Sequence, residues 1–322
     1  MWLFHESKYP FIKQRRKAYV LSGILLTLGI GAMVTNVITM GNWQNYGVDF
    51  TGGSLVQIGF DQPTTAAELR EALGGPDAPP ITRFGADDEF VIRAPLAEGA
   101  EVAEVAADLS EQIAAAYGAG TFEIERQDLV GPKIGAELQQ KAGLAILFSL
   151  VLTLLYIAIR FEFRFGVAAV IATAHDVLIT LGFLALFRVE ISLPTVAALL
   201  TILGYSLNDT IVVFDRIREN LGKKGGRRAN PYELVNRSIN ETLPRTVLTS
   251  GTTVAVLGAL LILGGAVIRD FTMVLILGIL IGTYSSIFVA SPALLEIQER
   301  WGTGDDGKKK KKKRPKEAAA AV

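Results

Sequence analysis

Six long runs of uncharged, apolar residues constrain this 322-residue chain more than any other feature. The hydrocarbon core of a bilayer is about 30 Å thick and a helix rises about 1.5 Å per residue, so about 20 apolar residues span it. Backbone that faces lipid must satisfy its own hydrogen bonds, which favours a helix for each run. The sequence therefore predicts a polytopic membrane protein, an all-α bundle of six transmembrane helices. The expected spans are residues 18–40, 138–159, 166–187, 191–214, 246–268 and 271–295.

Basic residues lie mainly on one side of these spans. Of the 32 Lys and Arg residues, 24 fall in residues 1–17, 160–165, 215–245 and 296–322. If each of the six runs crosses the membrane, these four segments lie on the same side of it. The positive-inside rule identifies this side as the cytoplasm, so both termini are expected there. The first run is longer than the core of a signal peptide, and no clear small-x-small cleavage site follows it. This pattern favours an uncleaved anchor.

Two polar segments on that side have their own character. Residues 215–245 are too polar to span and contain a Gly-Lys-Lys-Gly-Gly hinge before a helical stretch over residues 231–243, so we expect a cytosolic elbow. The tail, residues 296–322, is of low complexity and contains six consecutive lysines. We interpret the tail as a solvated end with some attraction for anionic membrane lipid rather than as a nucleic-acid site.

The only large external segment, residues 41–137, reads as a folded α+β domain. Alternating apolar residues predict strands and longer amphipathic stretches predict helices. The expected order is strand 54–60, helix 64–73, strand 81–85, strand 89–94, helix 101–117 and strand 121–127. This order predicts a ferredoxin-like fold. Its expected task is contact with something outside the membrane.

Asp209 is the strongest single functional signal, because a charged side chain inside a span costs about 2.5 to 3.5 kcal/mol on insertion scales. Arg245 opens the fifth span, and Asn208 precedes the aspartate. Burial favours the protonated form of Asp209 and a nearby Arg245 favours its charged form, so a motion that parts and rejoins them would move a proton. A buried ion pair that only fixes helix register is the alternative. Hydroxyls predicted on the Arg245 face are Thr249, Thr252 and Thr253.

Other polar or small residues inside the spans are less specific. His175 and Asp176 lie in the middle of the third span, where they are either a second relay or a hydrogen-bonded packing pair; the residues leave both open. Gly278, Gly282 and Ser286 follow small-xxx-small spacing in the sixth span, which is typical of close helix packing.

Several chemistries have no support in the sequence. The chain has no cysteine, only two histidines, no phosphate-binding P-loop motif and no His-Glu-x-x-His motif. We therefore expect no ATPase, no other enzyme and no metal site. The only cofactor expected is a coupling ion, a proton or sodium.

A set of motifs resembles the SecF family of the bacterial protein-export apparatus. The resemblance covers nearly the whole chain except the lysine tail, and the fourth-span motif is long enough to be specific. The motifs lie at residues 47–53 (Gly-Val-Asp-Phe-Thr-Gly-Gly), 130–132, 160–165, 175–176, 205–220 and 245–250.

The resemblance implies one half of a resistance-nodulation-division (RND) transporter, paired as a heterodimer with the homologous SecD subunit in the bacterial inner membrane. It implies use of the proton motive force to complete preprotein export through the SecYEG channel, with YajC as a further candidate partner. Asp209 matches the family's proton-linked aspartate, and Arg245 matches its fifth-helix arginine. The external domain resembles the smaller of the two subunits' soluble domains, so contact with preprotein is expected mostly from SecD.

Two other functions remain as alternatives. One is a proton-driven exporter of small molecules or lipids from the same superfamily, which usually has twelve spans and two external domains in one chain. The other is a scaffold whose charges only hold helices in place. The sequence does not decide the ion stoichiometry, the preproteins that depend on the chain, or the choice between protons and sodium.

Overall fold

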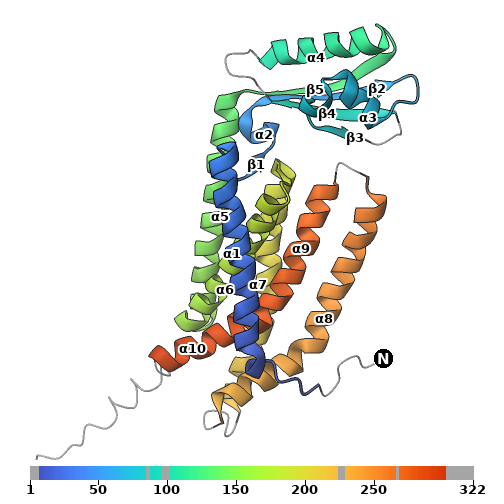
Figure 1. Ribbon diagram of the computed structural model, residues 1–322. Helices are drawn as coiled ribbons and strands as arrows, with labels where there is room; N and C mark the ends of the chain where they lie inside the picture. The colour runs from blue at the N-terminus through green and yellow to red at the C-terminus, as the bar shows by residue number, and fades with distance from the viewer. Residues whose placement is uncertain (1–6, 85–87, 96–101, 224–228, 266–267, 302–322) are drawn as a thin grey trace, which may run out of the picture.

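A helical bundle and a small sheet domain stacked on one end of it make up the structure, a computed structural model (Figure 1). It describes residues 7–84, 88–95, 102–223, 229–265 and 268–301. Residues 302–322, which include the lysine run of the tail, and residues 224–226 of the expected hinge lie outside the described residues.

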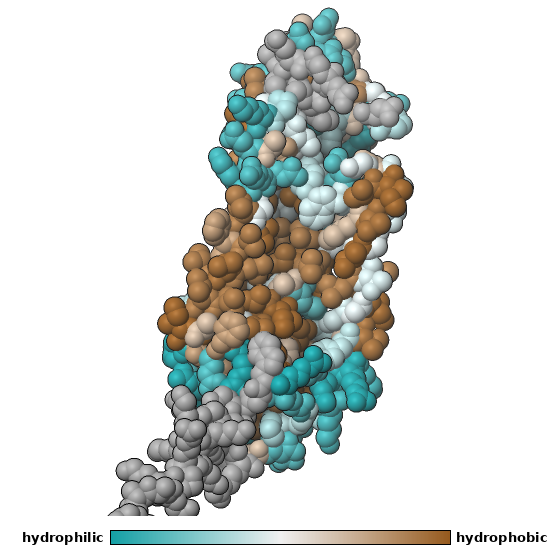
Figure 2. Space-filling view, turned by 90° about the vertical axis from the view of Figure 1, so that its left-hand side faces the viewer, coloured by the Kyte–Doolittle hydropathy of each residue, from teal (hydrophilic) through white to brown (hydrophobic). Residues whose placement is uncertain are grey.

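Six helices in the described part of the chain are long and apolar enough to cross a membrane. Helices α6, α7 and α9 form the centre of the bundle, whereas α1, α5 and α8 expose many large apolar side chains. Figure 2 shows the resulting apolar band around the middle of the bundle, with hydrophilic residues above it on the sheet domain and below it. Five of them are α1 (Arg15–Met40), α5 (Pro132–Arg160), α6 (Phe163–Leu186), α7 (Leu193–Gly222) and α8 (Pro231–Leu263). The sixth, Arg269–Arg300, begins with α9 (Arg269–Ser285).

The helices extend beyond the spans expected from hydropathy, because hydropathy marks only the part that lies in hydrocarbon. Helix α5 begins at Pro132, directly after Gly131, since proline suits the first turn of a helix. In the expected elbow, α7 continues to Gly222. Helix α8 begins at Pro231, where the side chain of Asn230 caps it. Most of residues 215–245 is therefore helix.

Helix α8 ends at Leu263, earlier than the expected span end at residue 268. Gly264 and Gly265 follow, and Gly265 has a φ of 74°, a conformation that glycine adopts at little cost and that ends helices. The last span is also not one regular helix. After α9, residues Ser286–Ala290 form a π-helical turn, η4, and α10 (Ser291–Trp301) follows.

Glycines let the central helices approach closely. A Cβ atom on Gly278 of α9 would lie 2.1 Å from Ile202 of α7, and one on Gly282 would lie 2.9 Å from Ser206 of the same helix. The expectation that Gly278 and Gly282 serve close helix packing is therefore confirmed. Gly29 of α1 and Gly182 of α6 make the same kind of contact.

The sheet domain has the expected ferredoxin-like order. Its antiparallel sheet runs β3-β4-β2-β5, and α4 lies on the side away from the bundle (Figure 1). Both of its helices contribute buried residues to one core with the strands. A capping box between Thr65 and Glu68 fixes the start of α3. The elements are β2 (Gly53–Phe60), α3 (Ala66–Ala72), β3 (Ile81–Arg83), β4 (Glu89–Pro95), α4 (Val102–Tyr117) and β5 (Phe122–Val130).

The glycine motif at residues 47–53 joins the sheet domain to the bundle. Asp49 accepts a hydrogen bond of 2.9 Å from the backbone N–H of Leu193 at the start of α7. Gly52 has a φ of 82°, and a Cβ there would meet the backbone of Pro132 at 2.9 Å. The close approach and the positive φ both require glycine.

A short parallel pair of strands and an ion pair complete this junction. Strand β1 (Asn45–Tyr46) pairs with β6 (Glu190–Ile191), which links α6 to α7. Arg93 of β4 reaches Glu190, with 3.5 Å between Nε and Oε1. The sheet domain is thereby fixed to the end of α6 and α7, the two helices that carry the buried carboxylates described next.

Candidate functional site

Asp209 lies where α7, α8 and α9 meet, and it is only 2% exposed. Its carboxylate accepts hydrogen bonds from Ser250 Oγ at 3.2 Å and Thr283 Oγ1 at 3.5 Å. Thr283 also donates to Ser250 at 2.8 Å. Hydroxyl groups from two other helices therefore hold the buried carboxylate through long, weak contacts.

Arg245 does not contact Asp209 as the sequence led us to expect. Both residues are described, and no ion pair joins them. Arg245 is exposed on α8. The buried face of α8 is instead the one that carries Thr246 and Ser250. The helix is therefore turned so that the residue after Arg245, not Arg245 itself, faces the bundle.

The predicted threonines and Asn208 take different positions. Thr249 and Thr252 donate to carbonyls of their own helix, which satisfies their hydroxyls locally. Thr253 accepts a hydrogen bond of 3.1 Å from the hydroxyl of Tyr205 on α7. Asn208 is exposed beside Asp209. None of these four residues is among the hydrogen-bond partners of Asp209 in the described structure.

Asp176 is a second buried carboxylate, 1% exposed, in the middle of α6. It accepts hydrogen bonds from Ser206 Oγ at 2.5 Å and from Ser285 Oγ at 2.7 Å. His175 Nδ1 lies 2.9 Å from its other oxygen. Three helices thus meet at Asp176, as they do at Asp209, but through shorter contacts.

A chain of polar groups leads from Asp176 toward the start of α1. His175 Nε2 lies 3.0 Å from Ser22 Oγ, and that hydroxyl lies 3.1 Å from the hydroxyl of Tyr284. Tyr284 in turn donates to the carbonyl of Ala18 at 2.8 Å. The chain runs through apolar helices toward the end of the bundle farther from the sheet domain.

The two carboxylates share the helices that hold them. Ser206 and Asp209 lie one turn apart on α7, and Thr283 and Ser285 lie two residues apart on α9. The π-helical turn η4 follows directly after these α9 residues; such turns often mark functional sites in helices. No group of three or more potential metal ligands occurs within the described residues.

Sequence reasoning identified the two carboxylates and His175 but missed most of their partners. Hydroxyl residues are common in membrane helices, so one chain gives no local signal that singles out these. The run Thr283-Tyr284-Ser285-Ser286 in an otherwise apolar span was the best available indication. The missed residues are Ser22, Ser206, Ser250, Thr283, Tyr284 and Ser285.

The fold and this site define a multi-pass membrane transport subunit, with titratable carboxylates buried among six helices and one α+β domain outside them. Residues 110–300 match the family of the protein export membrane proteins SecD/SecF, C-terminal, and residues 45–64 match the SecD/SecF GG motif. The chain belongs to the SecF family of protein translocase subunits.

Relatives across nearly the full length support this membership. The chain is 45% identical over 327 residues to protein translocase subunit SecF of Gemmatimonas aurantiaca, covering 99% of this chain and 96% of that protein. It is 41% identical to the same subunit of Escherichia coli O157:H7, covering 90% of this chain and 88% of that protein. Both relatives are translocase subunits, so the alternative of a small-molecule or lipid exporter gains no support from them.

Solved structures show the same fold. The crystal structure of SecDF from Thermus thermophilus, a translocon-associated membrane protein, superposes with a TM-score of 0.74 at 40% identity. A structure of SecDF in a super-membrane-facing form gives a TM-score of 0.70. The chain spans 40% and 41% of those two chains, while 93% and 96% of this chain are covered.

Proposed function

We propose that this chain acts with a SecD-type half and uses the proton motive force to promote late steps of preprotein movement through SecYEG. Its membership of the SecF family supports the translocase role, and its match to only part of the SecDF chains supports a second half. The role is transport and requires no bond-making chemistry of the chain itself. YajC remains a candidate partner on the same basis.

An exposed polar face supports the need for a partner in the membrane. Thr201 and Asn208 on α7 and Thr252 on α8 are exposed within spans that are otherwise apolar, and Arg245 is exposed directly before the fifth expected span. A charged arginine facing hydrocarbon is costly, and such residues normally face a bundle interior or a water-filled cavity. A SecD-type half covering this face would supply that environment.

Asp209 is the group we assign to proton coupling. It directly follows the exposed Asn208, and among the described residues its hydrogen-bond donors are the hydroxyls of Ser250 and Thr283 rather than a cation. A movement of α8 or of the partner that brings Arg245 toward Asp209 would favour the carboxylate and release the proton. The π-helical turn after α9 gives this part of the bundle a place to flex.

Thr246 supports a route for the proton to Asp209. It is 2% exposed and lies one turn from Ser250 on the same face of α8. Its hydroxyl has no hydrogen-bond partner among the described residues. A buried polar group of this kind normally binds water. Water at this position would extend the hydroxyl path that ends at Asp209.

His175 and Asp176 are proposed as a second proton-carrying group rather than a simple packing pair. The contacts from Asp176 through His175 and Ser22 to Tyr284 are each 3.1 Å or shorter. Hydroxyl and imidazole groups at these distances both accept and donate protons. The geometry therefore supports a relay along α1 and α6.

The proposed location is the inner membrane of a bacterium with both termini in the cytoplasm. The basic residues gather at the end of the bundle away from the sheet domain, which supports this orientation by the positive-inside rule. The sheet domain then lies on the outer side, where preprotein emerges.

The experiment is proton-dependent export in vesicles that contain this chain, SecD and SecYEG. Asp209→Asn keeps the shape of the side chain but removes the titration, so stimulation of export by the proton gradient should fall at least tenfold. Asp61→Asn, an exposed aspartate in the sheet domain, is the matched control and should leave export unchanged. Full stimulation of export with Asp209→Asn would contradict the proposal. If a sodium gradient alone stimulates export, the coupling ion is sodium rather than the proton.

A further inference from the structure

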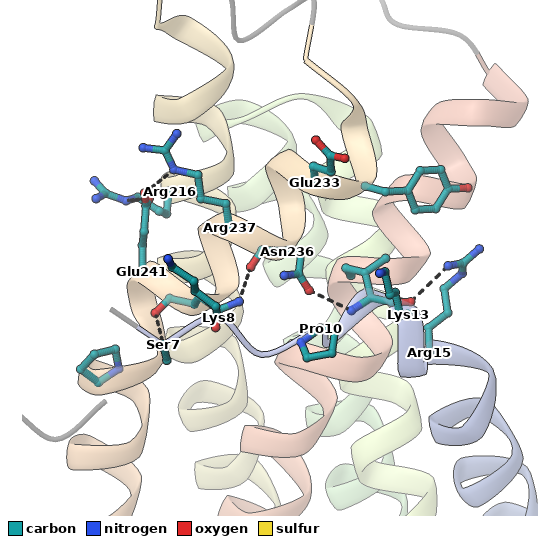
Figure 3. Close-up of a pocket in the computed structure, with 14 residues that line it drawn as sticks. Ser7, Lys8, Pro10, Lys13, Arg15, Arg216, Glu233, Asn236, Arg237 and Glu241 are labelled. Atoms are coloured by element: carbon teal, nitrogen blue, oxygen red, sulfur yellow. Dashed lines mark hydrogen bonds and ion pairs between the residues drawn. The ribbon is translucent and has the colours of Figure 1, made fainter. Parts of the chain in front are cut away.

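A cavity of about 1010 Å³ opens at the end of the bundle away from the sheet domain. It lies between the segment before α1, which includes the 3-10 turn η1 (Ile12–Gln14), and the first turns of α8 (Figure 3). This volume is at the upper end of the range for small-molecule sites, about 300 to 1,000 Å³. Neither Asp209 nor its hydrogen-bond partners Ser250 and Thr283 line the cavity, and no step proposed above uses it.

Two asparagines hold the wall of this cavity in place. Asn240 accepts a hydrogen bond of 2.8 Å from the backbone N–H of Tyr9 and donates one of 2.9 Å to its carbonyl. Asn236 donates to the same carbonyl at 2.9 Å and accepts from the N–H of Ile12 at 3.1 Å. The segment before α1 is therefore fixed along α8 by its backbone, whatever its side chains bind.

The lining of the cavity is strongly basic. Five basic side chains and two carboxylates line it. Arg216 and Arg237 both bind Glu241, at 2.6 and 2.8 Å, so that carboxylate is already neutralised. Figure 3 shows Lys8 on the side of Arg216 and Arg237, and Lys13 with Arg15 on the opposite side.

Two of these cations have their charge available. Neither Lys8 nor Lys13 makes an ion pair within the part of the chain that the structure describes. Arg15 stacks on the ring of Tyr232 at 4.9 Å and donates to the carbonyl of Ile12. Glu233 is the remaining carboxylate, so the lining keeps an excess of positive charge that suits an anion.

An apolar strip leads from the cavity along the outside of α8. Pro244 lines the cavity, and Leu248, Ala255 and Ile262 follow it at spacings of four and seven residues, which place them on one side of the helix. Leu248 is 53% exposed and Ile262 is 81% exposed. All four residues of this strip are apolar.

We propose that the cavity binds the phosphate headgroup of an anionic phospholipid from the leaflet at this end of the bundle. Lys8 and Lys13 bind the phosphate, and the strip from Pro244 to Ile262 carries an acyl chain. Basic pockets between helices at a membrane surface are suited to such headgroups. The combination of a basic cavity with an apolar exit distinguishes a lipid from a soluble phosphate compound, which has no use for the strip.

The test uses the full chain purified in mild detergent, to which phosphatidylglycerol, phosphatidylcholine or inorganic phosphate is added. Native mass spectrometry measures how much of each stays bound to the protein. In the variant Lys8→Gln/Lys13→Gln, the affinity for phosphatidylglycerol should fall about 30-fold, since each lysine at an anionic surface contributes roughly a factor of five. The matched control is Arg16→Gln/Lys17→Gln, which removes the same charge from exposed residues outside the lining and should change the affinity less than twofold.

Three results would overturn the proposal. Retention could be unchanged in the Lys8 and Lys13 variant, which would remove the assigned ligands. It could fall equally in the control, which would show general attraction by charge alone. Inorganic phosphate or phosphatidylcholine could compete as well as phosphatidylglycerol, which would exclude a site for an anionic lipid.

Asn236→Ala/Asn240→Ala provides a second variant that keeps every charge. It releases the segment before α1, so it should also weaken the retention of phosphatidylglycerol. Unchanged retention in this variant would contradict the site.

Discussion

The two buried carboxylates are equally hidden but very differently held. Asp176 accepts hydrogen bonds at 2.5 and 2.7 Å and contacts His175 at 2.9 Å. Asp209 accepts two hydrogen bonds from the described residues, at 3.2 and 3.5 Å. A carboxylate with short contacts from two other helices and from a neighbouring imidazole is fixed in place, whereas one with two long contacts changes partners at little cost. The difference supports the coupling role proposed for Asp209 and the relay role proposed for Asp176.

The comparison predicts a larger stability loss at Asp176 than at Asp209. Asp176→Ala leaves the hydroxyls of Ser206 and Ser285 without their acceptor, and each buried unsatisfied group costs about 1 to 3 kcal/mol. Asp209→Ala should cost about 1 kcal/mol, because Thr283 and Ser250 still bond to each other. Denaturant unfolding of both variants in detergent measures this difference, and equal losses would break the comparison.

Single hydroxyl deletions separate the two sites further. Ser250→Ala removes the shorter contact to Asp209 and should change the pH profile of proton-dependent export, with a rate effect of about fivefold for roughly 1 kcal/mol. Ser206→Ala should destabilise the bundle by about 1 kcal/mol and leave the pH profile as it is. Export assays from acid to neutral pH, run beside unfolding, distinguish these outcomes. A changed profile only in Ser206→Ala would reverse the assignment.

The smallest expected effect lies outside the spans, at the junction with the sheet domain. Burial raises the pKa of Glu190, Arg93 opposes this shift, and Asp270 and Asp49 add to it. The unfolded chain therefore releases this proton at a lower pH than the folded chain, so stability falls as pH rises from the ordinary glutamate value through the raised one.

Glu190→Gln should abolish that pH dependence, which we expect to be about 1 kcal/mol or less. Thermal unfolding of the wild type and the variant across this pH range measures it. If the stability of the wild type instead rises with pH over this interval, the pKa of Glu190 is lowered rather than raised on folding. The contact with Arg93 would then outweigh the effect of burial.

The architecture follows from local signals. The six spans and the sheet domain were predicted because apolar runs and alternating strands are encoded within each segment. The full length of α5 was not, since this helix begins at Pro132, in polar residues before the apolar stretch. The helical stretch at residues 231–243 was predicted, but not that it continues through Pro244 into the span as one helix, α8. The π-helical turn also escaped prediction, because Ser286–Ala290 has no sequence pattern that separates it from a regular helix.

The site was predictable only in part, for a physical reason. Asp209, Asp176 and His175 stood out because polar groups are costly in hydrocarbon. Their partners depend on how each helix is rotated against its neighbours, and no single span encodes that rotation. Arg245 shows this clearly: it was grouped correctly with Thr249 on one face, yet the packing of α8 turns that face outward and brings Ser250 to Asp209.

Infrared difference spectroscopy tests the central claim most directly. The full complex in vesicles is compared with and without a proton gradient, and the carboxyl C=O band reports which acid changes its protonation. The account predicts that Asp209→Asn removes the band, while Asp176→Asn shifts or weakens it without removing it. A band that survives in Asp209→Asn and disappears in Asp176→Asn would contradict the assignment of proton coupling to Asp209.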